Sequence, residues 1–205
     1  MLSILQAAGW PIWPLILCSI LVLALIIERL IQLQTSRVSP PELLGPVMQS
    51  NLQFSMDARQ VEQLEQSGAL GQVLASGLKA VQLNPRASDE EVRSSMEMAG
   101  RVAAQNLERY LTTLGTLASA APLLGLLGTV VGMIEIFGAQ QANSNQPAQL
   151  AHGISVALYN TAFGLVIAIP ALMFWRYFRA RVDRLVLGLE VAADRFARQL
   201  AMRRH

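Results

Sequence analysis

Two stretches decide the fold of this chain: APLLGLLGTVVGMIEIF at residues 121–137 and GISVALYNTAFGLVIAIPA at residues 153–171. Except for Glu135, they lie in two long segments without Asp, Glu, Lys or Arg, at residues 110–134 and 136–175, and a third such segment covers residues 1–27. A helix of roughly 20 apolar residues crosses a hydrocarbon core of about 30 Å. With 53% hydrophobic and 15% charged residues, the chain is predicted to be an all-α integral membrane protein with three transmembrane helices. A soluble single domain is excluded.

The predicted order of segments follows from these stretches and from the charges between them. We expect an outer N-terminus at 1–9, transmembrane helices at 10–31, 110–137 and 153–175, a cytoplasmic helical loop at 32–109, an outer hairpin at 138–152 and a cytoplasmic helical tail at 176–205. The first span has neither a basic start nor a small-residue cleavage site, so it is interpreted as a retained helix. Its Cys18 is the only cysteine, which excludes an internal disulfide and favours a packing role.

The topology is predicted from the basic residues. All sixteen Lys and Arg residues lie in residues 28–109 or 176–205, eight in each. The positive-inside tendency places such segments in the cytoplasm, which predicts an outer N-terminus and an inner C-terminus. We therefore expect anionic inner-leaflet lipids as partners of the arginines near the span ends, and no nucleic acid.

The cytoplasmic parts are predicted to be helical. Helical spacing covers residues 42–54 and 57–83, with a break at Ser67 and Gly68 and a stop at Asn84 and Pro85. Ser88 and Glu91 then form a capping-box pattern, from which one uninterrupted helix is expected to continue into the second span. In the tail, apolar residues recur at spacings of three and four: Phe178, Val182, Leu185, Leu189, Ala192, Phe196 and Leu200. This stripe predicts a partner helix, and an amphipathic helix on the membrane surface is the alternative.

Small residues follow one face of the second and third spans. On a helical wheel each set fits within an arc of about 100°: Gly115, Ala118, Pro122, Gly125, Thr129 and Gly132 in the second span, and Gly153, Ala157, Asn160, Thr161, Gly164, Ala168 and Ala171 in the third, with Pro170 near its inner end. Such stripes allow close helix packing. Packing explains Thr129, Asn160 and Thr161 less well, and these three are candidates for lining a proton pathway.

A titratable group is missing from the spans' central parts: these parts contain no Asp, Glu, Lys, Arg or His. Glu135 lies near the outer end of the second span, where an interfacial or intersubunit role is expected. His152 has no second His, Cys or acid at ligand spacing except Glu135 across the hairpin, so no metal site is predicted. A proton pathway through these helices needs a protonatable group from a second polypeptide.

At these residues the sequence resembles the MotA/TolQ/ExbB family, most closely its ExbB and TolQ branches. The second span matches the family pattern AP-x-x-GL-x-GTV-x-G and the third matches GI-x-x-AL-x-x-TA-x-GL-x-x-AIPA. The resemblance implies a multi-pass protein of the bacterial inner membrane without enzymatic activity or cofactor. It also implies a homo-oligomeric ring, pentameric in ExbB-type channels. This ring surrounds single-span partners of the ExbD/TolR type, which bring a membrane aspartate, and the complex drives TonB or TolA with the proton-motive force.

The resemblance also implies roles for individual residues, and the sequence differs from the family pattern at one important position. Thr129 and Thr161 match the pore-facing threonines of the family, and Pro122 and Pro170 match its helix-shaping prolines. Gly125, Gly132 and Gly164 would serve helix packing. Many relatives have Glu where this chain has Val156, so a mechanism that requires this Glu cannot operate here. A MotA-type stator subunit matches less well because it would have four spans.

Several functions other than a proton-channel subunit of the ExbB type are compatible with parts of the sequence. Within the family, the alternatives are a TolQ-like envelope-integrity motor or another cargo system. Outside it, a non-conducting scaffold or transporter subunit would not depend on a partner's membrane Asp. His152 and Ser155 prompt an intramembrane serine protease, but no GxSG motif is present and a helix N-cap explains the pair better.

Overall fold

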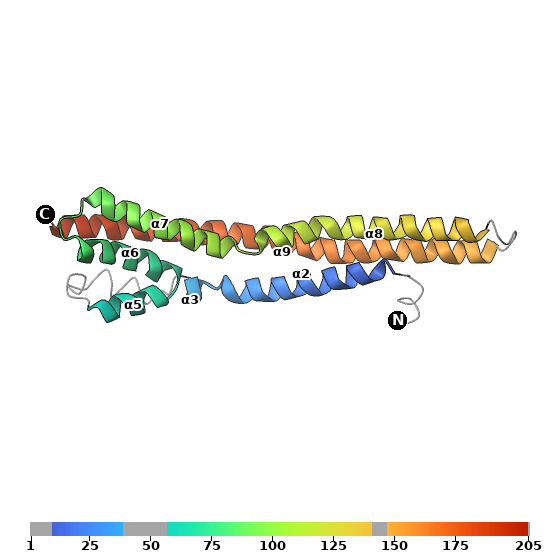
Figure 1. Cartoon of the computed structure of the whole chain (residues 1–205), viewed down its shortest axis with the longest axis horizontal. Coiled ribbons are helices and arrows are strands. Elements are labelled where there is room, and N and C mark those ends of the chain that lie inside the picture. Colours follow the sequence, from blue (N-terminus) through green and yellow to red (C-terminus); the bar gives the residue numbers. More distant parts are fainter. Residues whose placement is uncertain (1–9, 39–56, 141–146, 205) are drawn as a thin grey trace. The chain divides into compact units, whose positions relative to one another are not determined.

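The structure, a computed structural model, describes residues 10–38, 57–140 and 147–204 (Figure 1). Its elements are the helices α2 (Ile12–Gln32), α3 (Thr35–Val38), α5 (Ala58–Gln66), α6 (Ala69–Leu83), α7 (Asp89–Glu108), α8 (Leu111–Gln140) and α9 (Pro147–Arg204). Three helices are long and apolar enough to cross a membrane, in agreement with the predicted all-α fold. The predicted outer N-terminus, the helix expected at 42–54 and residues 141–146 of the hairpin lie outside the described residues.

The chain divides into two compact units. The first, called the apolar unit below, comprises residues 1–28 and 110–177, and the second, called the polar unit, comprises residues 29–109 and 178–205. The helices α2 and α9 contribute to both, because each runs through a boundary between the two sets of residues.

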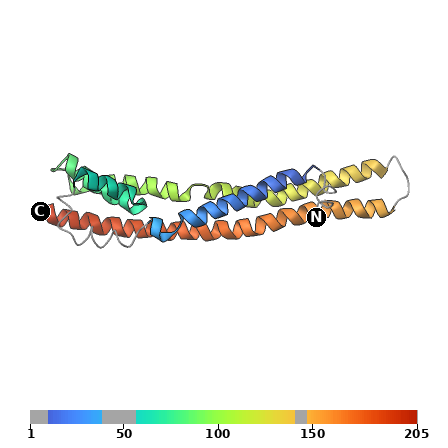
Figure 2. The ribbon, with the colours of Figure 1, turned by 90° about the horizontal axis from the view of Figure 1, so that it is seen from below.

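In the apolar unit, α8 and the first part of α9 lie side by side (Figures 1 and 2). One face of α2 is buried, with residues three or four apart that are at most 7% exposed: Ile12, Leu15, Cys18, Val22 and Ile26. Elsewhere the unit exposes large apolar side chains, such as Leu123 and Val166, each 66% exposed. A surface of this kind suits lipid and not water.

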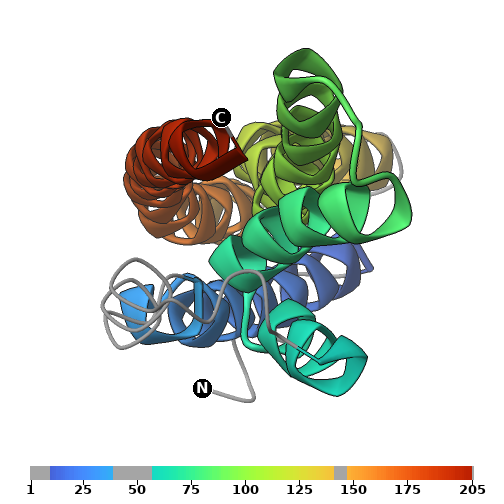
Figure 3. The ribbon, with the colours of Figure 1, turned by 90° about the vertical axis from the view of Figure 1, so that its left-hand side faces the viewer.

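In the polar unit, α6 lies between α5 and α7 and contacts both (Figure 3). The break predicted between α5 and α6 is confirmed, and Gly68 adopts a φ of 124° there, a conformation that glycine tolerates best. The predicted capping box is also confirmed: the Glu91 amide donates to the Ser88 hydroxyl, and the Ser88 amide donates to the Glu91 carboxylate.

The prediction of one uninterrupted helix from Ser88 into the second span is wrong. The helix α7 ends at Glu108, and Tyr110, with a φ of 63°, separates it from α8. In a continuous helix, the Leu107 carbonyl would accept from the amide of residue 111. Instead it accepts a hydrogen bond of 3.1 Å from the buried guanidinium of Arg29. A residue 78 positions away thus provides the hydrogen bond at the end of α7.

The apolar stripe of the tail is buried within the polar unit. Leu185 is half-buried, and the other six predicted members are at most 7% exposed. Phe196 points toward α6, where a Cβ atom placed on Gly77 would lie 3.7 Å from its ring. The prediction of partner helices is therefore confirmed, and the stripe is not available to a membrane surface.

Candidate functional site

The candidate site is the contact between α8 and α9 in the apolar unit, where Gly125 and Gly164 meet. A Cβ atom placed on Gly125 would lie 2.8 Å from the Asn160 carbonyl oxygen and 3.3 Å from the Gly164 Cα. A Cβ on Gly164 would lie 2.6 Å from the Ala121 carbonyl oxygen. Real Cβ atoms essentially never come within 3.0 Å of another atom in this way. The two backbones therefore pack directly against each other, and this packing requires glycine at both positions.

Asn160 is the most buried polar side chain of this contact, with 1% of its surface exposed. Its amide lies against Gly128, where an added Cβ would come within 3.0 Å of the amide nitrogen. Gly128 is not among the site residues predicted from the sequence. The regular glycine spacing in GLLGTVVG was the available signal. Further along, Gly132 faces Ala157, with 3.2 Å between the Ala157 Cβ and a Cβ placed on Gly132.

The two candidate threonines have different surroundings. The Thr161 hydroxyl donates across the contact to the Gly125 carbonyl oxygen at 3.2 Å. The Thr129 hydroxyl donates to the Leu126 carbonyl of its own helix at 2.7 Å. Thr129 also lines an open hollow of about 470 Å³ on α8, together with Val130, Met133, Ile134, Phe137 and Gly138. Within one chain, then, the interhelical contact includes the hydroxyl of Thr161 but not that of Thr129.

Both candidate prolines lie inside helices. Pro122 is half-buried in α8 and Pro170 is exposed in α9. Proline has no amide hydrogen to donate to the carbonyl four residues earlier. Each of these helices therefore lacks one backbone hydrogen bond, which is a suitable place for a bend.

The remaining candidates lie away from the contact. Glu135 is exposed on α8, and the side chains of His152 and Val156 lie outside the described residues. Ser155 donates to the Ala151 carbonyl one turn earlier at 2.9 Å, as a helix-surface serine commonly does. Among the residues that the structure describes, no group of three His, Cys, Asp or Glu side chains could hold a metal ion.

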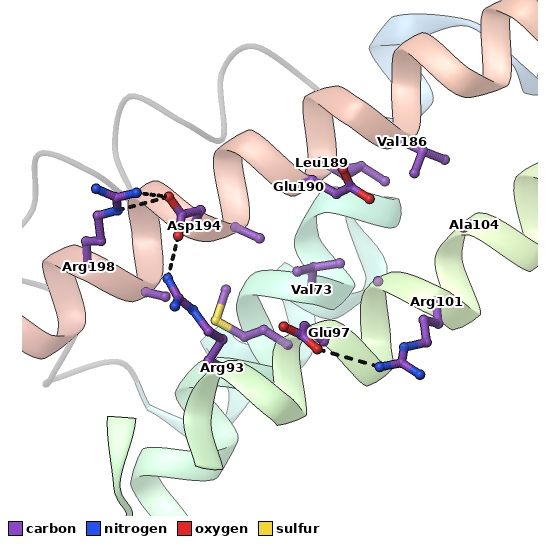
Figure 4. A pocket seen from close by; sticks show the side chains of 14 residues that line it. Val73, Arg93, Glu97, Arg101, Ala104, Val186, Leu189, Glu190, Asp194 and Arg198 are labelled. Atoms are coloured by element: carbon purple, nitrogen blue, oxygen red, sulfur yellow. Dashed lines mark hydrogen bonds and ion pairs between the residues drawn. The ribbon is translucent and has the colours of Figure 1, made fainter. Parts of the chain in front are cut away.

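Several ion pairs lie within the polar unit. Between α7 and α9 lies a cleft of about 630 Å³ (Figure 4). At one end of it, Asp194 accepts from Arg93 at 2.5 Å and from Arg198 at 2.7 Å. Hydrogen bonding to Arg198, together with the charge of Arg93, lowers the pKa of Asp194 below its ordinary value. Two arginines share this one carboxylate, and over the whole lining of the cleft three arginines are balanced by Glu97, Glu190 and Asp194.

Comparison with known proteins gives one family. Residues 65–191 match the profile of the MotA/TolQ/ExbB proton channel family. The biopolymer transport protein ExbB1 of Vibrio cholerae is 33% identical over 195 residues, which cover 90% of this chain and 82% of that protein. A TolQ protein of the Tol-Pal system from Pseudomonas aeruginosa is 36% identical over 115 residues, 56% of this chain and 50% of TolQ.

A relative from an archaeon matches as well. A biopolymer transport protein ExbB homolog of Methanothermobacter thermautotrophicus is 35% identical over 150 residues, 72% of this chain. The chain spans about half the length of this relative, 51%. Proteins of this family are channel components and not enzymes, and ExbB and TolQ relatives match at similar identity.

Proposed function

Because the chain belongs to the MotA/TolQ/ExbB proton channel family, we propose that it is an ExbB-like subunit of an inner-membrane proton channel that drives TonB-type transport. The observation that carries this proposal is the α8–α9 contact, which places a threonine and an asparagine at the centre of spans where no carboxylate is present. A TolQ-like role in an envelope-integrity motor is the second candidate, supported by the similarity to TolQ proteins.

The proposed assembly is a homopentameric ring with outer N-termini and inner C-termini. The ring surrounds a single-span subunit of the ExbD/TolR type, which supplies a membrane aspartate, and acts on a transducer of the TonB or TolA type. The basic residues of the polar unit would lie near anionic lipids of the inner leaflet. This assembly would explain why the spans lack a titratable centre: the proton carrier belongs to the partner.

In the proposed mechanism, the hydroxyls of Thr129 and Thr161 solvate the partner's aspartate as it gains and loses a proton. A hydroxyl that donates one hydrogen bond can still accept others, so the bond of Thr161 to Gly125 is compatible with this role. Each proton that crosses a potential of 100 mV releases about 2.3 kcal/mol. Alternate protonation of the aspartate would then shift or rotate the partner within the ring.

The test is the Thr161→Val variant, purified with its partner and reconstituted into vesicles with a pH-sensitive dye inside. Valine has nearly the same volume as threonine but cannot donate the interhelical hydrogen bond. Such bonds contribute about 0.6 kcal/mol on average between membrane helices. The complex should assemble, whereas proton flux under an applied potential should be lost.

The matched control is Thr116→Val, which removes a hydroxyl that bonds the Thr112 carbonyl of its own helix at 2.9 Å. This variant should conduct normally. Normal flux through the Thr161→Val variant would refute the pathway role. Flux that persists after the partner's membrane aspartate is replaced by Asn would refute the channel mechanism and favour the scaffold alternative.

A further inference from the structure

The polar unit exposes two rows of side chains, on α7 and on α9, that nothing in the described chain covers. The α7 row consists of Ser94, Met98 and Val102, and the α9 row of Leu187, Val191 and Arg195, with members four residues apart. Met98 and Val102 are 63% and 51% exposed, and Leu187 and Val191 are 60% and 46% exposed. The core sides of the same helices hold Met96, Ala103, Leu189 and Ala192, which are at most 7% exposed.

Two ion pairs align α7 with α9, and this alignment gives the position of each row along the helix axes, called its height below. Arg93 pairs with Asp194 at 2.5 Å, and Glu108 pairs with Arg179 at 3.5 Å. The intervals 93–108 and 179–194 both span fifteen residues, so α7 and α9 are antiparallel and keep one register. Figure 4 shows the Arg93–Asp194 pair at one end of the cleft between them.

This register places the two rows at nearly the same height. Counted from the Arg93–Asp194 pair, Met98 lies five residues along α7 and Val191 three residues along α9. At about 1.5 Å per residue the heights differ by about 3 Å, and the same difference holds for Val102 and Leu187. This difference is smaller than one helical turn of about 5.4 Å.

The two rows also match in chemistry. When Val102 is set against Leu187 and Met98 against Val191, Arg195 comes opposite Ser94. One turn beyond Ser94 lies the exposed carboxylate of Glu90, in an acidic first turn. Arg195 has no carboxylate partner among the described residues, so an apolar pair of contacts would be flanked by opposite charges.

We propose that the α7 row of one copy of this chain packs against the α9 row of a second copy. The rows differ from each other, so the contact is heterologous, and a heterologous contact repeats around a ring or along a filament. Their nearly equal heights favour the closed ring. This inference rests on the ring of the proposed function and assigns the surfaces that form it outside the apolar unit.

The test is disulfide crosslinking between two differently tagged copies, both carrying Cys18→Ala, coexpressed and oxidised with copper phenanthroline in native membranes. One copy carries Met98→Cys and the other Val191→Cys. Most of the protein is expected to form a dimer that carries both tags, and Val102→Cys with Leu187→Cys should behave alike. Disulfides require Cα atoms within about 7 Å, so the reaction reports direct contact.

The matched control pairs Met98→Cys with Glu190→Cys. Glu190 lies one residue from Val191 but lines the cleft within one chain (Figure 4), so little dimer is expected. Equal crosslinking at both positions of α9, or crosslinking of Met98→Cys mainly to itself, would overturn the proposal. The second result would indicate a two-fold contact instead.

A charge substitution gives an independent measurement. The Met98→Glu variant should lower the mass of the detergent-solubilised oligomer, whereas Leu83→Glu should not, although Leu83 is 87% exposed. A multi-copy complex that conducts protons without these crosslinks would refute this interface and leave the proposed function intact. A single-copy protein in the membrane would refute both.

Discussion

Replacing Gly125 by alanine tests whether the backbones of α8 and α9 touch. Two effects oppose each other in this variant. Alanine is favoured over glycine in a helix by about 0.5–1 kcal/mol. The added methyl group, however, would lie 2.8 Å from the Asn160 carbonyl oxygen and 3.0 Å from the Thr161 Cα. Since both neighbours are backbone atoms, relief requires the helices to separate, and overpacking of this kind costs about 1–3 kcal/mol.

The control is Gly138→Ala in the same helix, because beyond the neighbouring backbone of α8 no described atom lies within 4 Å of a Cβ at that position. Both variants share the helix-propensity gain, so their difference isolates the steric cost. Gly138→Ala should unfold at equal or higher denaturant than the wild type. Gly125→Ala should be about 1–3 kcal/mol less stable than Gly138→Ala, as measured by circular dichroism during unfolding in mixed detergent micelles.

A double substitution sharpens this prediction. A Cβ on Gly164 would lie 3.1 Å from the Gly125 Cα, so the two glycines share one contact. Once the first alanine has separated the helices, the second should cost less, and the double variant should be destabilised by less than the sum of the single variants. Additive losses, or a Gly125→Ala variant as stable as Gly138→Ala, would refute direct backbone contact.

Three further predictions concern the polar unit and the start of α8. Arg29→Met should destabilise the chain by about 1–3 kcal/mol because the buried Leu107 carbonyl loses its donor, and chemical unfolding would detect this; an unchanged midpoint would contradict it. Tyr110→Gly should be tolerated whereas Tyr110→Val should lower the melting temperature, since a β-branched residue is strained at a φ of 63°; equal melting temperatures would contradict the strained turn. Hydrogen bonding to Arg198 lowers the pKa of Asp194, so the contribution of this carboxylate to stability is present above its ordinary pKa and is lost as the pH falls through the lowered pKa; Asp194→Asn should therefore lower the melting temperature at pH 7, and by progressively less as the pH falls through that pKa.

The elements that could be predicted from the sequence depend on local patterns. The uncharged spans depend on the composition of one continuous stretch of sequence, and the capping box at Ser88 and the break at Gly68 depend on residues within one or two helical turns. The wheel also placed Gly125 and Gly164 on stripes suited to close packing, and in the structure these two glycines are in contact. Small residues allow few other arrangements of two apolar helices at this distance.

What could not be predicted depends on residues far apart in the sequence. The end of α7 involves Arg29, and no local pattern around Leu107 indicates this donor. Likewise, the wheel placed Thr129 on the same stripe as Gly125, but it could not show that the hydroxyl bonds within its own helix. A rotamer is determined by neighbouring atoms in space and not by sequence spacing.

The closeness of α8 and α9 restricts where a proton path can lie. A contact that leaves no room for a Cβ atom at Gly125 or Gly164 leaves none for water between the two helices at this level of the chain. At this level a path would therefore run along the outside of the pair, against another copy or a partner helix. Thr129 has the geometry for such a contact, because it lines an open hollow on α8 and its oxygen retains accepting capacity beyond the bond it donates. Thr161, which is half-buried in the interhelical contact, would reach the same partner only through its exposed edge, whereas Asn160 is 1% exposed and is enclosed by the contact.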